Sequence, residues 1–274
     1  MWEISQEERQ KKFSEIAAPY NEMIDKIIGK EKALLRNVSG NTEETARTRL
    51  KLAEEMFNLC SWYIVECKIF LRFFGRHNED ILNEARKALY KGIAYIEDTV
   101  SPWVDVPFSD YEDKVAMLSG VSGKKRYLVI RKMGLAADLL KDFFGDSSKW
   151  KWSFVVSEGR LAAAAKNLLD MKSMVVNLDP RSEEHEATVF HLRRVKKLLM
   201  QAAERYREKY ELSSRNTEDF QQAINFLNAL KRFHTLLNER SEAEEIRKTV
   251  EVWNNKLKDD LRRKKEGSVE SREW

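Results

Sequence analysis

Residues 42–74 constrain the fold more than any other segment. Apolar side chains recur there at alternating intervals of four and three residues, the spacing of a continuous seam along one helix. The seam consists of Ala46, Leu50, Ala53, Phe57, Cys60, Ile64, Cys67, Leu71 and Phe74. A second apolar stripe runs beside it from Leu52 to Phe73, so the apolar face is broad enough to contact two or more neighbouring helices. We expect 42–74 to be the most buried helix of the protein.

The remaining sequence is also typical of helices. The chain has only 4 Pro and 10 Gly in 274 residues, and no segment alternates with the period of two that a sheet requires. Ser5, Ser109 and Ser241 are each followed by Glu three positions on, a pattern that begins helices, while Gly29, Gly75 and Gly145 are predicted to end them. The predicted helices cover about 5–28, 42–74, 78–99, 109–119, 124–144, 157–177, 180–211, 217–239 and 241–264.

These patterns predict an all-α protein, either a multi-helix bundle or an irregular α-solenoid of roughly eight to ten helices. Its length is sufficient to bury an apolar core without disulfides or metals. We expect one helical domain over 1–264, with two layers that could hinge at 100–109, where Pro102 and Pro107 disfavour helix. The polar residues 265–274 are expected to form a frayed tail.

The cellular location is predicted from two kinds of segment that the sequence lacks. The first residues lack the basic start and apolar run of a secretory signal, and no stretch is long and uncharged enough to span a bilayer. We therefore expect a cytoplasmic protein. Cys60 and Cys67 lie seven positions apart, which on a helix separates their Cα atoms by about 10 Å, too far for a disulfide. We expect buried free thiols.

Glu66 interrupts the second stripe of 42–74. An ionised carboxylate in an apolar stripe is costly unless it meets a cation, accepts hydrogen bonds or has a raised pKa. We favour a buried ion pair that specifies helix register over a metal ligand or a general acid. A ferritin-like metal site requires Glu three positions before His. The residues three positions before the four histidines are Phe74, Ser182, Thr188 and Lys231.

The other motifs do not indicate a catalytic or nucleotide-binding site. The segment GVSGKKR at 120–126 resembles a phosphate-binding loop only in part, because it lacks the first glycine and the Ser or Thr after lysine. No arrangement of Ser, His, Cys and Asp indicates nucleophilic catalysis, so we expect no enzyme activity, cofactor or metal. The basic run HLRRVKK at 191–197 is expected to be solvated surface.

We assign the partner-binding surface to region 101–152. Aromatic side chains on a stiff loop would serve as anchors, and nearby cations would steer an acidic partner. The candidate binding residues are Trp103, Phe108, Lys124, Lys125, Arg126, Trp150, Lys151 and Trp152. At least one of the three tryptophans is expected to be substantially accessible.

The leading functional hypothesis is a non-catalytic interaction protein, such as a scaffold, adaptor or assembly factor, that binds another protein. Residues 1–120 carry 17 Lys and Arg against 21 Asp and Glu, whereas the rest carries 32 against 24. That basic second part leaves an alternative open, namely a nucleic-acid-binding protein that uses region 121–151. Self-association is compatible with either hypothesis. The third hypothesis is an enzyme whose active site cannot be recognised from the sequence.

Overall fold

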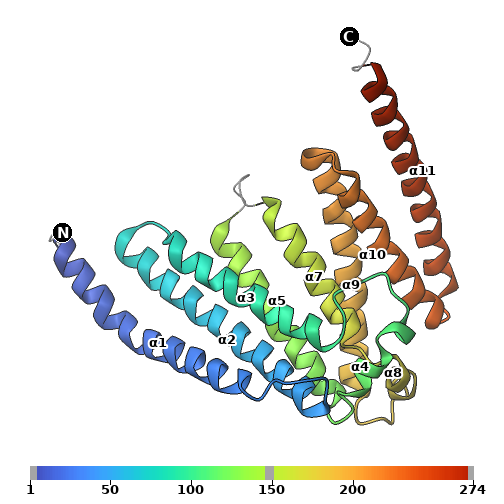
Figure 1. Ribbon diagram of the computed structural model, residues 1–274. Helices are drawn as coiled ribbons and strands as arrows, with labels where there is room; N and C mark the ends of the chain where they lie inside the picture. The colour runs from blue at the N-terminus through green and yellow to red at the C-terminus, as the bar shows by residue number, and fades with distance from the viewer. Residues whose placement is uncertain (1–4, 146–150, 271–274) are drawn as a thin grey trace.

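The computed structural model describes residues 5–145 and 151–270, with side chains described as far as residue 264. In those residues the chain forms ten α-helices and no strand, so the predicted all-α fold is confirmed (Figure 1). The helices are α1 (Gln6–Leu35), α2 (Glu43–Phe74), α3 (Glu79–Thr99), α4 (Glu112–Ala116), α5 (Gly123–Phe144), α7 (Ser153–Asn167), α8 (Met171–Asn177), α9 (His185–Lys209), α10 (Thr217–Leu236) and α11 (Arg240–Glu270).

The long helices stack in chain order from α1 to α11, each running back along the one before it (Figure 1). Helices α2, α5 and α9 lie side by side in one layer, and α3 and α7 lie against each other in a second. Helix α1 packs on α2 at one end of the stack, and α11 packs on α10 at the other. The core therefore extends along the stack, in an arrangement closer to a solenoid than to a closed bundle.

Local signals place most helix ends correctly. The side chain of Ser5 accepts from Glu8 N at 3.2 Å, and the side chain of Glu8 accepts from Ser5 N at 3.3 Å, which completes the predicted capping box. The helix that begins after Thr42 ends at Gly75, whose φ of 66° is the left-handed conformation that glycine adopts without strain. These contacts join residues close in sequence, which is why the sequence reveals them.

Two predicted helix ends are wrong, and at the first of them tertiary packing outweighs a weak local signal. Helix α1 passes through Gly29 and continues to Leu35. A glycine inside a helix costs only about 1 kcal/mol, and Ile27 and Glu31 on either side of it are buried. At the other end of the chain, α11 continues to Glu270 through most of the predicted frayed tail, and residues 271–274 lie outside the described part.

Three further boundaries between 108 and 185 differ from prediction. The Ser109 hydroxyl hydrogen-bonds to Asp110 rather than to Glu112, so only a short turn and α4 form in 109–119. The predicted helix 157–177 is divided, because the Asp170 side chain accepts from Lys172 N at 3.0 Å and begins α8. Helix α9 begins at His185 rather than at 180, after turns over 178–184.

Burial is greatest in α7 rather than in α2. Eleven of the 15 residues of α7 are buried, against twelve of the 32 residues of α2. Phe57 and Ile64 are 1% exposed as expected, but Leu71 is only half-buried. Helix α7 is more buried because it lies between α3, α5 and α9, whereas the second half of α2 lies near one end of the stack.

Candidate functional site

Helix α5 carries most of the predicted cations, and its ends are held by local caps. The Ser122 hydroxyl accepts from Lys125 N at 3.2 Å, and Gly145 follows the last turn with a φ of 69°. Between these caps, side chains seven positions apart fall on the same face of the helix. Lys125 and Lys132 therefore both point toward α2.

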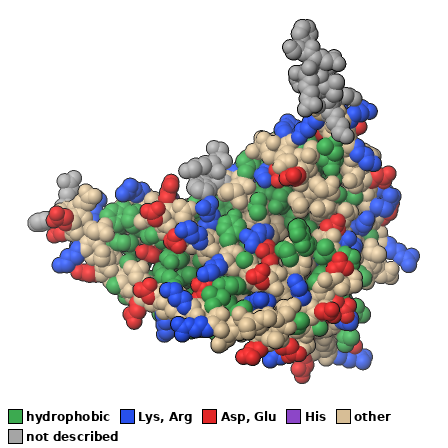
Figure 2. Space-filling model, in the orientation of Figure 1, with side chains coloured by type: hydrophobic (Ala, Val, Ile, Leu, Met, Phe, Trp, Pro, Cys, Tyr) green, Lys and Arg blue, Asp and Glu red, His purple; other side chains and the backbone are tan. Residues whose placement is uncertain are grey.

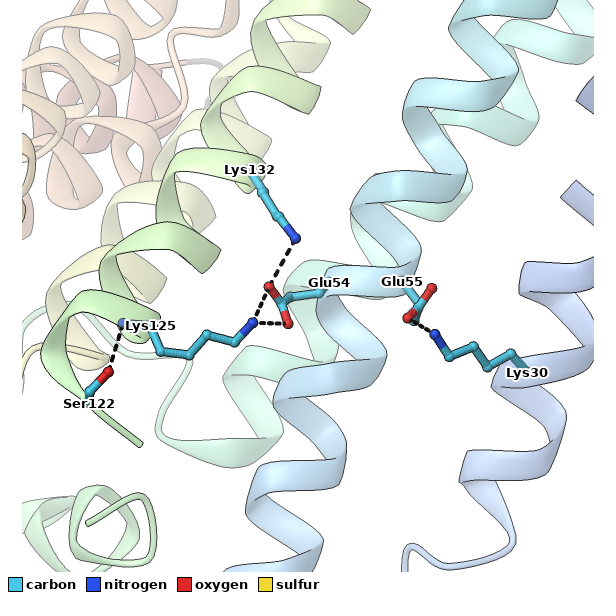
Figure 3. Close-up of polar contacts among 6 residues, drawn as sticks. All are labelled: Lys30, Glu54, Glu55, Ser122, Lys125 and Lys132. Atoms are coloured by element: carbon cyan, nitrogen blue, oxygen red, sulfur yellow. Dashed lines mark hydrogen bonds and ion pairs between the residues drawn. The ribbon is translucent and has the colours of Figure 1, made fainter. Parts of the chain in front are cut away.

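Lys125 and Lys132 bind the same carboxylate, that of Glu54 on α2 (Figure 3). Lys125 Nζ lies 2.7 and 2.8 Å from the two carboxylate oxygens, and Lys132 Nζ lies 3.1 Å from one of them. Burial alone would raise the pKa of Glu54, but the two lysines outweigh it and hold the pKa below its usual value. The predicted steering residue Lys125 is thus committed to an internal ion pair.

Glu55, the neighbour of Glu54, points toward the other side of α2 and pairs with Lys30 of α1 (Figure 3). Consecutive carboxylates of one helix turn therefore fasten α2 to two different helices. Both lie within the seam-bearing segment, although the sequence pattern does not distinguish them from solvated residues.

Arg126 is a correction to the predicted surface, because it is only 4% exposed. Its guanidinium donates to the carbonyl oxygens of Leu118 at 2.7 Å, Val121 at 3.1 Å and Leu168 at 3.4 Å. Burial lowers the pKa of Arg126, and nearby Asp170 and Glu184 oppose that shift. It satisfies carbonyls where α4 and α7 end, whereas Lys124 beside it is exposed.

A groove of about 460 Å³ runs between α5 and α9. It is lined by Tyr127, Leu128, Arg131, Lys132, Leu135, Asp138 and Arg194. Leu135 is 59% exposed and Leu128 37% exposed. An apolar surface that alternates with cations in this way is suited to recognition rather than to core packing. We call these seven residues the α5–α9 groove.

The second wall of the α5–α9 groove comes from the basic run at 191–197. Arg194 lies across α5 at Gly134, where an added Cβ atom would stand 2.6 Å from Arg194 Nη2. Phe190, 41% exposed, stacks on Tyr127 with ring centroids 6.1 Å apart, and Arg131 lies 6.0 Å from the Tyr127 ring centroid. Of the run expected to be solvated, Arg193 and Lys197 are exposed, but Arg194 is half-buried in the groove.

Trp103 has the accessibility expected of an anchor, with 67% of its surface exposed. Its loop contacts α7 and α10. Asn167 Nδ2 donates to the carbonyl oxygens of Ser101 at 2.7 Å and Trp103 at 3.0 Å, and Asp105 pairs with Arg232 of α10. Phe108, the other aromatic residue predicted there, is half-buried against the core.

Lys166 is a buried cation that sequence reasoning missed. It is 3% exposed, and its Nζ lies 2.9 Å from Asn167 Oδ1, 3.2 Å from the Tyr111 hydroxyl and 3.4 Å from the Val106 carbonyl oxygen. Burial, together with Arg232, lowers the pKa of Lys166 to about 7. One sequence signal was present, because Lys166 is the single charged residue of LAAAAKNLL at 161–169.

The remaining predicted residues lie at the opposite end of α5. Lys151 and Trp152 precede α7, where Phe144 and Phe154 are in contact with ring centroids 5.5 Å apart. A helix of the length of α5 spans about 33 Å, so these residues cannot share one compact surface with Lys124. Trp152 is half-buried beneath Lys151 and Arg205, and Trp150 lies outside the described residues. The described binding residues predicted in region 101–152 therefore do not form one compact surface.

The ion pair expected for Glu66 is not found among the described residues. Within residues 5–145 and 151–270, no hydrogen-bond or ion-pair partner of its carboxylate is described, and the residue is half-buried. Burial raises the pKa of Glu66 above its usual value. Among the alternatives set out for this residue, the structure supports the raised pKa. The paired carboxylate of α2 is Glu54 instead.

Replacing Glu66 by glutamine should raise the free energy of unfolding at pH 7, because the half-buried glutamine carries no charge that burial would penalise. A carboxyl whose folded pKa is raised opposes folding once it ionises, so the gain should disappear as the pH falls below its unfolded pKa of about 4.3. Urea denaturation at pH 7 and pH 4 measures both values. A large loss of stability at pH 7 would instead indicate a favourable partner for the ionised carboxylate.

The fold and the α5–α9 groove define an all-α protein of sequentially stacked helices with a mixed basic and apolar surface site. Residues 9–261 match the model of the TP0443 family, so the chain belongs to that family. No curated protein and no solved structure matches it significantly. In the part of the chain that the structure describes, no group of three or more His, Cys, Asp or Glu is placed to hold a metal ion. Nor does any described helix combine the length and apolar character needed to cross a membrane.

Proposed function

We propose that this protein is a non-catalytic helical scaffold, adaptor or assembly factor that binds a protein partner in the α5–α9 groove. The observation that carries the proposal is the α5–α9 groove itself, in which cations from α5 and from α9 lie beside exposed leucines. Grooves between helices commonly accept an amphipathic helix of the partner, with apolar anchors at spacings of three and four residues. Leu128 and Leu135 lie two turns apart and would contact such anchors.

Charge complementarity favours an acidic partner. The groove contains Arg131, Lys132 and Arg194 against the single acid Asp138. Lys132 already pairs with Glu54, so Arg131 and Arg194 are the cations most available to a partner. Arginine suits this role because its planar guanidinium binds carboxylates with two parallel hydrogen bonds.

The chemistry of the cysteines supports a non-catalytic role in the cytoplasm. Cys60 and Cys67 are both buried and unpaired, and burial raises the pKa of each thiol to about 12. Thiols of that kind are poor nucleophiles at neutral pH. Two free thiols also fit the reducing environment of the cytoplasm.

Nucleic acid is the weaker candidate for the same surface. Arg131 over Tyr127 resembles the combination of cation and aromatic ring that stacks on bases. However, Lys125 and Lys132 are paired with Glu54 and Arg126 is buried, which leaves few cations for phosphates. On the face shown in Figure 2, Lys and Arg side chains are interspersed with Asp and Glu rather than gathered in one basic area.

A photo-crosslinking amino acid at position 135 tests the proposal in the native cell extract. We expect it to capture a protein that the same group at Val252 does not, since Val252 is 64% exposed on the distant helix α11. The captured protein is then purified, and its association rate with the full chain is measured. Reversing charge with Arg131→Glu and Arg194→Glu should reduce that rate about 10-fold or more, whereas Lys258→Glu on α11 should leave it unchanged.

Two outcomes would contradict the proposal. Equal capture at positions 135 and 252 would show that the groove is not selective. Binding of single-stranded nucleic acid in which log K falls steeply with log salt concentration, and which Arg131→Glu weakens, would favour the nucleic-acid alternative.

A further inference from the structure

A second cavity, of about 230 Å³, lies at the N-terminal end of α5, where α8 and α9 approach it. It is separate from the α5–α9 groove, and none of its lining residues belongs to that groove. Its volume is below the roughly 300 Å³ at which sites for drug-sized ligands begin. The cavity is therefore of a size for a small metabolite.

The floor of this cavity contains Arg126, which makes no direct ion pair among the residues that the structure describes, although Asp170 and Glu184 lie near enough to favour its charge. Three of its five N–H groups donate to carbonyl oxygens. The other two donors have no partner in the part of the chain that the structure describes, and a buried guanidinium is stabilised by an anionic partner. His191 beside it is 2% exposed, and burial lowers its pKa to about 4, so it carries no charge at neutral pH.

Two carboxylates stand on the wall of the same cavity. One oxygen of Asp170 accepts from Lys172 N at 3.0 Å and from Ser173 N at 3.4 Å, and one oxygen of Glu184 accepts from Lys124 N at 2.8 Å. The second oxygen of each carboxylate has no partner described in 5–145 and 151–270. Each residue thus caps a helix with one oxygen and leaves the other available to a ligand.

The cavity consequently presents one guanidinium and two carboxylates at neutral pH. A simple anion would face both carboxylates, and a simple amine would leave the two remaining guanidinium donors without an acceptor. A molecule that carries both a carboxylate and an ammonium group complements all three charges. Leu168 and Met174 add apolar wall, which suits an aliphatic side chain.

We propose that this cavity binds a free aliphatic α-amino acid, with its carboxylate on Arg126 and its ammonium group between Asp170 and Glu184. This site is independent of the partner-binding groove. The ligand would replace no protein contact, because it uses the donors and acceptors that the helix caps leave free.

Isothermal titration calorimetry on the full chain tests this site with leucine, valine and methionine as probes. We expect at least one to bind, and we expect 3-methylbutylamine and 4-methylpentanoic acid, which each carry only one of leucine's two charges, to bind about 10-fold more weakly or worse. Absence of binding by all three amino acids at millimolar concentration would overturn the proposal. Equal binding of the amine or the acid would overturn it as well.

Two conservative variants test the assignment of residues. Asp170→Asn and Glu184→Gln keep an oxygen for the helix caps but remove the charge, so each should weaken amino-acid binding about 10-fold with little change in the thermal midpoint of the free protein. Glu183→Gln, an exposed neighbour, should bind as the unaltered chain does, and so should Arg131→Glu in the groove. Unchanged affinity in both cavity variants would refute the assignment.

Discussion

Replacing Asn167 by alanine should destabilise the protein by about 3 kcal/mol, because it leaves buried polar groups without partners. Asn167 is fully buried, and its amide donates to the carbonyl oxygens of Ser101 and Trp103 while its oxygen accepts from Lys166. Each buried group left unsatisfied costs about 1–3 kcal/mol, and the better helix propensity of alanine recovers only a few tenths. Urea denaturation with an unchanged m value measures the loss.

The same variant tests whether the loop 100–107 is held in place by α7. Without the two amide bonds, the loop should become accessible to limited proteolysis between Ser101 and Pro107, although Trp103 is already exposed in the native state. Asn255→Ala, an exposed position on α11, serves as the control and should change stability by no more than about 0.5 kcal/mol. Equal effects of the two substitutions would mean that the two amide hydrogen bonds do not hold the loop against α7.

Acidification from pH 7 to pH 4 should remove about 3 kcal/mol of unfolding free energy through His191 alone. Burial lowers the pKa of this histidine to about 4, and the carbonyl of Ala165, 2.8 Å from Nε2, only partly opposes that shift. The unfolded chain takes up the proton near pH 6.5 and the folded chain only near pH 4. The stabilisation by neutral His191 is therefore complete above about pH 6.5, and it is lost progressively as the pH falls from about 6.5 to about 4.

Comparison with His191→Gln isolates this contribution from the carboxylates that titrate in the same range. Glutamine can still donate to the Ala165 carbonyl but takes up no proton. Between pH 7 and pH 4 the variant should therefore lose about 3 kcal/mol less unfolding free energy than the unaltered protein loses. His77→Gln changes an exposed histidine and should retain the slope of the unaltered protein. Parallel curves for His191→Gln and the unaltered chain would show that His191 titrates normally.

The structure also changes how the predicted cations should be understood. Region 121–132 has a basic sequence, yet Lys125 and Lys132 neutralise Glu54 and Arg126 satisfies backbone carbonyls. Most of that charge therefore stabilises the packing of α5 against its neighbours. Within the α5–α9 groove, the cations with no ion-pair partner among the described residues are Arg131 and Arg194, of which the second belongs to a run predicted to be solvated surface.

The helices and most of their ends could be predicted because the interactions that form them are local. The seam of 42–74, the capping box of Ser5 and Glu8, and the stop at Gly75 all depend on residues within about one turn or one stripe of each other. Such signals can be recognised from the spacing of residues in the sequence. The same reasoning failed at Gly29, where a weak local preference was opposed by burial of the flanking residues.

Only the tertiary structure decided which charged side chains are paired, buried or available. Glu54 and Lys125 are 71 positions apart, and Asn167 and Ser101 are 66 apart, so their contacts depend on how helices stack rather than on any pattern of neighbours. The sequence singles out Glu66, which interrupts an apolar stripe, and not Glu54, yet it is Glu54 that pairs with the lysines of α5. A helical period specifies the face on which a residue lies. What lies opposite that face is determined by the packing of the complete chain.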